Sequence, residues 1–523
     1  MACVCIFYTC KENNPQNTDV EIKVFQVQPS SIQLIYGSDN ASQQINVLMI
    51  PDNAADVLWS SDNDKVATVS QTGLVTATGA GITNIHAKAG NLTQKIPVTV
   101  LNGNNIIIYA EKNYNGKVSE LQKGVSTDIQ YKIASLLIPD GQRVKLYRDE
   151  KSGGGFLSFE KNQNDLTQSG WFNNIVKVVV EDYVEDEPMV KNYNYVLGAQ
   201  ISSYIKSEMY QKMANEMYYL GSNVIKVKAD VYANLSKDTD FRYIYLWYDQ
   251  WPRIDLDINI QSTYDNMYEL VRGLLNDHND TGKTFYIGNW ESDWVLLRDE
   301  NTGRQKIEES YIQNMIVWLN TRQKAIEDAK RDTPHTNVNV WHYAEANRTS
   351  DIFSIGAERF VNAVLPHTTI DYLSYTAYDF GALSSSQIND YVEYMDQMIP
   401  DKNDVPNPGK RVFIGEVGVP AMNYQYDQEK HNEVNLDLFI RYFDAGVSQI
   451  LHWEFSEDKI SSGMPAGYWL IDHDGNKWKL YYSYKAFYCN AKEYVRGYIA
   501  THGKTPDTAN FNAWASVFLK TLR

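Results

Sequence analysis

A strand-like apolar run followed by a long helical pattern recurs eight times in the C-terminal part of this 523-residue chain. Such alternation is typical of βαβ units, which build a parallel sheet. Eight units within residues 190–500 match the size and count of a (β/α)8 barrel, or TIM barrel, which we predict for this region. The predicted strands span residues 195–201, 223–229, 243–248, 284–290, 338–344, 370–377, 411–417 and 449–455.

A doubly wound open sheet is the alternative arrangement of the same units. Nucleotide-binding members of that class carry a glycine-rich phosphate loop after a strand. No such loop follows any of the eight predicted strands. We therefore favour the closed barrel, and we expect residues 501–523 to form a C-terminal extension to it.

Residues 22–101 have a different period, with two-residue alternation broken by Gly, Asp and Asn. Short alternating strands of this kind predict a small β-sandwich. The stretch "VLWSSDNDKVATVSQTGLVTATGAGITNIHAKAG" also resembles the group 2 bacterial immunoglobulin-like domain. Trp59, the "VATV" strand, the turn at Gly73 and the hairpin after it follow that family's order. The resemblance implies a spacer or adhesion module without catalysis.

Two similar units follow one another within residues 104–182, "IIIYAEKNYNGKVSEL" and "VKLYRDEKSGGGFLSF". Tyr109 and Gly116 of the first align at identical spacing with Tyr147 and Gly154 of the second. This duplicated Greek-key pattern resembles a βγ-crystallin domain. The fold class predicted for the whole chain is therefore multidomain: an Ig-like β-sandwich, a Greek-key β domain and a C-terminal TIM barrel.

The crystallin resemblance raises the question of calcium, which that family often binds through paired Asn or Asp followed by Ser/Thr-Ser. "NNIVKV" keeps Asn173 and Asn174 but lacks the serine, and "QYKIAS" keeps Ser135 but lacks the acids. A hard cation needs several oxygen ligands. We therefore expect weak calcium binding or none, and we predict no metal site and no cofactor for the chain.

The first 21 residues differ from everything that follows. They begin with the apolar, uncharged "MACVCIFYTC" and continue with a polar run. This opening resembles the tail of a lipoprotein signal peptide, with Cys10 as the lipidated residue. The resemblance implies a bacterial extracellular or cell-surface protein attached to the membrane through its N-terminus. No run of 18 apolar residues predicts a membrane-spanning helix.

Charge and aromatic content narrow the class of partner. A net charge of −17 argues against nucleic acid, whose phosphates would be repelled. The chain contains 37 Tyr and 12 Trp, and rings with a polar tip suit the apolar face and hydroxyl rim of a sugar. Tyrosine also fills ordinary β-sheet positions, so composition alone leaves both explanations open.

In a TIM barrel the functional groups lie at the C-terminal ends of the strands. Two glutamates stand at such ends, on the fourth and the seventh predicted strands. The candidate residues, in strand order, are Asn289, Trp290 and Glu291 from the fourth, His342 and Glu345 from the fifth, Tyr375 and Tyr378 from the sixth, Glu416 from the seventh, and Trp453 and Glu454 from the eighth.

This arrangement resembles clan A of the glycoside hydrolases. The resemblance implies that Glu416 in "FIGEVGVP" is the nucleophile and Glu291 in "FYIGNWE" the acid/base. Tyr375 or Tyr378 would hydrogen-bond the nucleophile, and Trp453 would form the floor on which the reacting sugar stacks. Two carboxyl groups about 5–5.5 Å apart retain anomeric configuration, whereas about 6.5–9.5 Å implies inversion.

The order Asn289-Trp290-Glu291 departs from that clan, in which the asparagine directly precedes the acid/base. Because strand side chains alternate, Asn289 and Glu291 would share a face only if the strand stays regular to its end. A bulge at Trp290 would restore the usual geometry. Trp290 and Trp294 could also desolvate Glu291 and raise its pKa.

Other assignments stay open. Asp293 could replace Glu291 as the acid if the strand ends later, while Glu345 and Glu454 are expected to be rim or supporting groups. His342 would line the pocket or orient a carboxylate rather than bind metal, because no second histidine is suitably spaced.

Two functions follow from these residues. The first is a retaining glycoside hydrolase acting on an extracellular poly- or oligosaccharide, with two β-domains as spacers or binding modules. The second is a non-catalytic glycan-binding or adhesion protein of the cell surface that uses the barrel cleft. The sugar, the linkage and the oligomeric state do not follow from the sequence.

Overall fold

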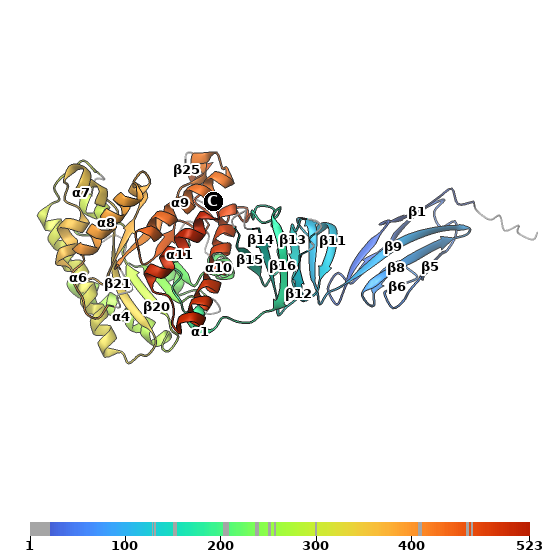
Figure 1. Ribbon diagram of the computed structural model, residues 1–523, viewed down its shortest axis with the longest axis horizontal. Helices are drawn as coiled ribbons and strands as arrows, with labels where there is room; N and C mark the ends of the chain where they lie inside the picture. The colour runs from blue at the N-terminus through green and yellow to red at the C-terminus, as the bar shows by residue number, and fades with distance from the viewer. Residues whose placement is uncertain are drawn as a thin grey trace, which may run out of the picture.

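The computed structural model describes residues 21–127, 129, 132–149, 154–201, 209–235, 240–248, 253–255, 258–298, 301–405, 410–456, 460–461 and 464–523. Three bodies lie in a row, with the Ig-like domain at one end and the barrel at the other (Figure 1). The predicted lipidation site, Cys10, lies outside the described residues.

The Ig-like domain forms as predicted, from short strands around one apolar core. Its main sheet has the order β2-β9-β8-β5, and two smaller sheets pair β1 with β4 and β3 and β6 with β7. Gly73 has a φ of +83°, and a Cβ there would lie 2.8 Å from the Trp59 ring, so glycine lets this turn close over the core tryptophan. The strands are β1 Val24–Gln28, β2 Ile32–Tyr36, β3 Ser42–Gln44, β4 Asn46–Ile50, β5 Val57–Ser61, β6 Ala67–Val69, β7 Leu74–Ala77, β8 Gly81–Ala89 and β9 Leu92–Asn102.

The second domain consists of two interlocked Greek keys. One sheet has the order β11-β10-β13 and the other β12-β16-β14-β15, so β12 of the first repeat pairs within the sheet of the second. In return, Gln163 of the second repeat bridges to Leu136 on β13. This exchange confirms the duplicated Greek-key fold. The strands are β10 Ile106–Glu111, β11 Asn115–Leu121, β12 Gly124–Ser126, β13 Ser135–Leu137, β14 Gln142–Arg148, β15 Phe156–Phe159 and β16 Ile175–Asp182.

The third domain is the predicted TIM barrel. Its eight parallel strands have the order β17-β24-β23-β22-β21-β20-β19-β18. A parallel bridge between Gln200 and Lys226 joins β17 to β18 and closes the ring. The strands are β17 Leu197–Ala199, β18 Val224–Lys228, β19 Tyr243–Trp247, β20 Thr284–Gly288, β21 Asn339–Ala346, β22 Tyr372–Thr376, β23 Val412–Val417 and β24 Ile450–His452.

Amphipathic helices cover the barrel, and side-chain caps set where several of them begin. Ser384 and Gln387 form a capping box at the start of α8, and Asn259 and Asp427 cap α4 and α9. The helices are α1 Pro188–Lys191, α2 Met209–Leu220, α3 Ala229–Tyr232, α4 Ile260–Asp277, α5 Ser292–Leu297, α6 Glu309–Asp332, α7 Thr349–Ile355, α8 Ser385–Met398, α9 Gln428–Asp444, α10 Lys479–His502 and α11 Thr508–Lys520.

The C-terminal residues belong to the body of the barrel domain. Helix α11 buries Phe511 and Leu519, and the Asn432 side chain on α9 donates to the carbonyl of Leu522. The predicted extension 501–523 thus begins inside the last turn of α10 and packs back against α9.

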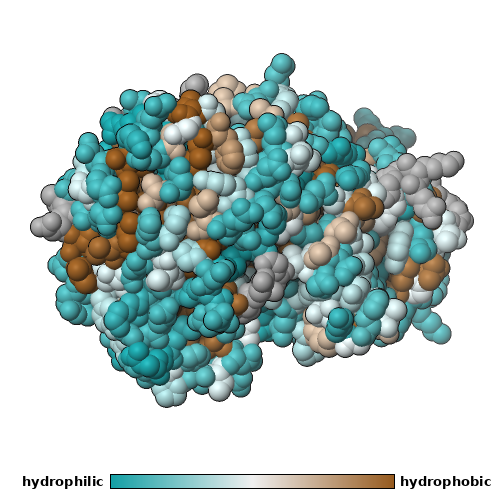
Figure 2. Space-filling model, turned by 60° about the vertical axis from the view of Figure 1, so that its left-hand side comes forward, coloured by the Kyte–Doolittle hydropathy of each residue, from teal (hydrophilic) through white to brown (hydrophobic). Residues whose placement is uncertain are grey.

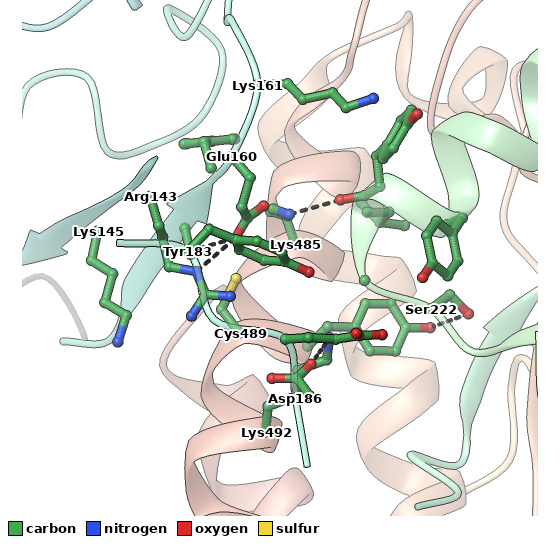
Figure 3. Close-up of a pocket in the computed structure, with 18 of the residues that line it drawn as sticks. Arg143, Lys145, Glu160, Lys161, Tyr183, Asp186, Ser222, Lys485, Cys489 and Lys492 are labelled. Atoms are coloured by element: carbon green, nitrogen blue, oxygen red, sulfur yellow. Dashed lines mark hydrogen bonds and ion pairs between the residues drawn. The ribbon is translucent and has the colours of Figure 1, made fainter. Parts of the chain in front are cut away.

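The Greek-key domain docks on the barrel through polar contacts. Arg148 donates to the carbonyl of Thr521 at 2.9 Å, and Asn490 on α10 donates to the carbonyl of Phe156 at 3.0 Å. A cavity of about 490 Å³ lies at this junction, lined by β14, β15, α2, α10 and the acidic segment 183–186 (Figure 3). The junction therefore combines apolar packing with polar contacts and a charged cavity.

Charged side chains around this cavity pair with one another. Arg143 contacts Glu160 at 3.0 Å, and Asp186 contacts Lys492 at 2.8 Å (Figure 3). Asp186 also pairs with Arg496. The face of the molecule in Figure 2 is mostly hydrophilic, with several small apolar patches. Among the described residues, no helix is both long and apolar enough to cross a membrane.

Candidate active site

The interior of the barrel changes from aromatic to polar along the strands. Its lower layer is a cluster of buried rings, in which Tyr245 and Tyr286 stack with centroids 4.4 Å apart. Above these rings, the same strands place Lys226, Glu345 and Ser374 in the interior, all without solvent exposure. Because parallel strands end at one rim, these groups meet Glu291 and Glu416 at the C-terminal end of the barrel.

Glu416 reaches the interior through a β-bulge in β23. Tyr375 is opposite Ile414 and the next residue, Thr376, is opposite Glu416, so Gly415 is the additional residue on β23. A Cβ on Gly415 would lie 1.8 Å from the Ser374 hydroxyl. Bulges re-aim side chains beside active sites. Here the bulge turns Glu416 inward after an inward-facing glycine, and only glycine fits the position.

Glu291 enters the site from the loop between β20 and α5 and not from a strand. Strand β20 ends at Gly288, two residues before the predicted end, and Glu291 precedes α5 in a left-handed conformation with φ 33° and ψ 70°. Asn289 and Glu291 lie beyond the end of β20, so the alternation of strand side chains does not decide where they point. The bulge that brings a glutamate into the site lies on β23, the seventh barrel strand, and not at Trp290. The Asn289 amide donates to Ser292 Oγ at 2.9 Å, while its Oδ1 has no donor among the described residues.

The two glutamates have contrasting environments. Burial, and then the charges of Glu416 and Glu345, raise the pKa of Glu291 to about 9. Glu416 accepts a hydrogen bond from the Tyr378 hydroxyl at 3.0 Å, which favours its ionised form. Although Tyr378 is 42% exposed as a whole, desolvation of its hydroxyl and the nearby Glu416 carboxylate raise its pKa well above the ordinary value, so this hydroxyl remains a donor. Glu291 thus favours its protonated form, whereas Glu416 has a hydrogen-bond donor that favours a charged carboxylate.

Tyr375 does not share this role with Tyr378. Its hydroxyl donates to Asp379 at 2.8 Å and accepts from the Thr349 amide at 3.1 Å. Of the two tyrosines that sequence reasoning left open, the structure brings only Tyr378 to Glu416.

Three indoles lie at the same end of the barrel as the acidic pair. Trp453 follows β24 and lies with its ring centroid 6.1 Å from that of Trp247, the last residue of β19. Trp290 is half-buried beside Glu291. Trp247 was missed by sequence reasoning, although its place at the end of a predicted strand is the signal that could have found it.

His342 does not join the site. On β21 the interior residues are Trp341, Tyr343 and Glu345, so the residue between them points outward. The His342 ring contacts Gln323 on α6, with Nδ1 and Oε1 3.1 Å apart. The expectation that His342 lines the pocket is therefore wrong, because the alternation of β21 aims Glu345 inward instead.

Asp293 is occupied elsewhere as well. Its carboxylate accepts hydrogen bonds from the backbone amides of Asn347, Arg348 and Phe360. These contacts anchor α5 to the loops after β21, so Asp293 is not placed to replace Glu291 as an acid.

A buried ion pair that the sequence did not predict completes the site. Lys226 Nζ lies 3.1 Å from Glu345 Oε2 and donates to the Gly415 carbonyl at 2.7 Å. The same ammonium lies 4.5 Å from the Trp247 ring centroid. A lysine inside the apolar run "NVIKVKA" is the sequence signal for it. In the described parts of the chain, no cluster of three or more His, Cys, Asp or Glu is arranged to hold a metal ion.

Comparison with known proteins identifies one part of the chain. Residues 23–100 match the family of bacterial Ig-like domains, group 2. No curated protein matches the sequence.

Similar solved structures include two glycoside hydrolases and one βγ-crystallin domain. An Ig-like-domain-containing GH10 xylanase from termite gut is 10% identical, with 89% of this chain and 100% of that chain covered and a TM-score of 0.35. A family 39 glycoside hydrolase from Bacteroides cellulosilyticus WH2 is 11% identical, with 70% and 79% covered and a TM-score of 0.37. A βγ-crystallin domain from Clostridium beijerinckii is 20% identical, with 14% and 95% covered and a TM-score of 0.13. At these identities, function has to be inferred from the residues of the site.

Proposed function

We propose that the barrel is a retaining glycoside hydrolase that acts on an extracellular poly- or oligosaccharide. The observation that carries this proposal is the contrast between two buried carboxyl groups at the ends of β20 and β23. Glu291 has a pKa raised to about 9, while Glu416 accepts a hydrogen bond from Tyr378. A protonated and an ionised carboxyl group facing one site are the two groups that glycosidic cleavage needs.

The first step follows from these protonation states. The Glu416 carboxylate attacks the anomeric carbon, and Glu291 gives its proton to the glycosidic oxygen, which leaves with the aglycone. In the second step, water attacks the anomeric carbon, gives a proton to the Glu291 carboxylate and releases Glu416. Trp453 and Trp247 would stack on the apolar face of the sugar, and Asn289 and Trp290 would contact it beside Glu291.

A panel of aryl glycosides tests this function. We expect hydrolysis of at least one member with retention of anomeric configuration, followed by NMR, and loss of about 10³-fold or more in kcat for Glu416→Gln. Glu291→Gln should impair substrates with poor leaving groups more than activated ones, because only the former need the acid. A 2-deoxy-2-fluoro glycoside should label Glu416, as read by peptide mass spectrometry.

Other outcomes separate the alternatives. Hydrolysis unaffected by both substitutions would contradict the two-glutamate mechanism. Glycan binding without hydrolysis would instead support a non-catalytic binding barrel. We further propose that the Ig-like and Greek-key domains hold the barrel at the surface of a bacterium and that a lipid on Cys10 attaches the protein to the membrane. Labelling with a radioactive fatty acid tests this attachment. The label should be incorporated into the parent protein and absent from Cys10→Ala.

A further inference from the structure

The ion pair between Lys226 and Glu345 contacts the backbone beside each of the two proposed catalytic glutamates. Both side chains have no exposed surface, and their charged atoms lie 3.1 Å apart. A buried ion pair contributes little net stability compared with apolar residues of similar volume. We therefore expect this pair to act mainly by fixing the positions of the backbone segments that it contacts.

On one side, the pair holds the bulge that carries Glu416. The bulge takes the backbone around Gly415 out of the regular ladder with β22. A displaced carbonyl in a dry interior needs a donor, and the Gly415 carbonyl accepts from Lys226 Nζ at 2.7 Å. Lys226 thereby stabilises the backbone conformation that turns the next side chain into the site.

On the other side, the pair holds the backbone of Glu291. This residue has a φ of 33°, in the left-handed region that is strained for a residue with a side chain. Its amide donates to Glu345 Oε1 at 3.4 Å, while Ser374 Oγ donates to Glu345 Oε2 at 2.6 Å. Glu345 is thus fixed by three donors from three elements.

We propose that Lys226 and Glu345 form a positioning pair that sets the separation and orientation of Glu291 and Glu416. This inference rests on the proposed glycosidase function. Neither residue needs to touch the sugar. A displacement of about 1 Å between reacting groups can reduce a rate about 10²-fold, so loss of the pair should lower kcat with little change in KM.

The charge of Glu345 gives a second effect that can be measured, a change in the pH dependence of activity. The ionisable groups facing Glu291 are Glu416 on β23, Glu345 on β21, Lys226 on β18, Asp293 on α5 and the Tyr378 hydroxyl after β22. Glu345→Gln keeps an oxygen acceptor for the Glu291 amide but removes one negative charge. The alkaline limb of the kcat/KM profile should therefore move to lower pH by about one unit. Mere loss of packing would not move it in this way.

The experiment compares Lys226→Met, Glu345→Gln and Ser374→Ala with a matched control. Lys402→Met removes the partner of a different buried carboxylate, Asp371, at 2.6 Å and on the outward side of the barrel. We expect about a 10²-fold lower kcat for Lys226→Met and a several-fold loss for Ser374→Ala. The control should lose thermal stability but keep the kcat and pH profile of the parent protein.

Crystal structures of the variants provide a readout that does not need activity. We expect the Gly415 carbonyl to rotate in Lys226→Met, with Glu416 displaced. Unchanged positions of Glu291 and Glu416, together with kcat within twofold of the parent, would overturn the positioning role. Ser374→Ala, which leaves no charge unpaired, decides the same question if Lys226→Met does not fold. A parent protein that hydrolyses no glycoside would refute the proposed function, whereas the variant structures would still show whether the pair sets the geometry.

Discussion

At the scale of single residues, the site depends on two backbone positions as much as on its carboxyl groups. Gly415 leaves the space that Ser374 and Glu345 occupy, and Glu291 adopts a left-handed conformation outside any strand. Both features bring acids into a barrel whose regular alternation would have aimed them elsewhere. Substitutions at these positions should therefore affect activity more than their size suggests.

Gly415→Ala tests the first position. The new Cβ would lie 1.8 Å from Ser374 Oγ and 2.6 Å from Glu345 Oε2, so the bulge must move. We expect about a 10²-fold loss of kcat and destabilisation of about 1–3 kcal/mol, measured by steady-state kinetics and urea unfolding. Gly497→Ala in α10 is the control, because a Cβ there meets no atom within 4 Å and should not destabilise the protein.

Glu291→Gln tests the raised pKa through stability. The pKa of Glu291 rises from 4.5 to about 9 on folding, so the folded state holds a proton that the unfolded state releases. That difference reduces stability as pH rises from about 4.5 to 9, by roughly 3 kcal/mol at pH 7. Glutamine has no such penalty. We expect Glu291→Gln to be more stable than the parent at pH 7–8 and similar to it near pH 4.5, by calorimetry; an equal difference at both values would refute the shift.

The sequence indicated the two candidate glutamates but not the residues that support them. Glu291 and Glu416 stand at strand ends, where barrel geometry collects functional groups. Lys226 and Glu345 interact across 119 positions of chain, and no local pattern reports such a contact. The bulge at Gly415 was equally invisible, since "FIGEV" reads as a regular strand. His342 was misplaced because the inward parity of β21 depends on neighbouring strands.

At the scale of elements, period-two and helical patterns were sufficient to predict all eight barrel strands and the two β domains. Strand ends were less accurate, as for β20, because the chain leaves the sheet wherever tertiary contacts favour it. The role of α11 was not predicted either. Its apolar face is complementary to α9, and the sequence of α11 alone does not identify that partner.

Phe511→Ala tests whether α11 is integral to the barrel domain. Phe511 is fully buried, whereas Val517 on the same helix is 63% exposed. We expect Phe511→Ala to lower the free energy of unfolding by about 3–5 kcal/mol and Val517→Ala to leave it nearly unchanged, measured by urea denaturation. Equal effects of the two substitutions would show that α11 does not pack as described.

At the scale of the whole molecule, the three domains form a row in which the Greek-key domain connects the other two (Figure 1). The contact between the Greek-key domain and the barrel includes charged pairs as well as apolar packing. Burial alone would raise the pKa of Asp186, but the charges of Lys492 and Arg496 lower it overall. Burial would also raise the pKa of Glu160, and the charges of Lys485 and Arg143 lower it overall. The junction should accordingly respond to acid.

Acidification tests this junction. Carboxyl groups with depressed pKa values stabilise the folded state above the unfolded pKa of about 4, and this contribution is lost as pH falls through the lower folded value. We expect the radius of gyration from X-ray scattering to stay constant down to about pH 4 and to increase below it. Asp186→Asn should shift that increase to higher pH. Asp62→Asn, in the Ig-like domain, should not shift it.

The exchange of strands in the Greek-key domain has a consequence for the ancestry of such chains. Because β12 and the segment around Gln163 each complete the sheet of the other repeat, neither repeat has a full sheet by itself. A recombination event between the repeats would leave two fragments with open edges. We therefore expect recombination to transfer both repeats together as one domain, with its boundaries near residues 102–105 and 183–187.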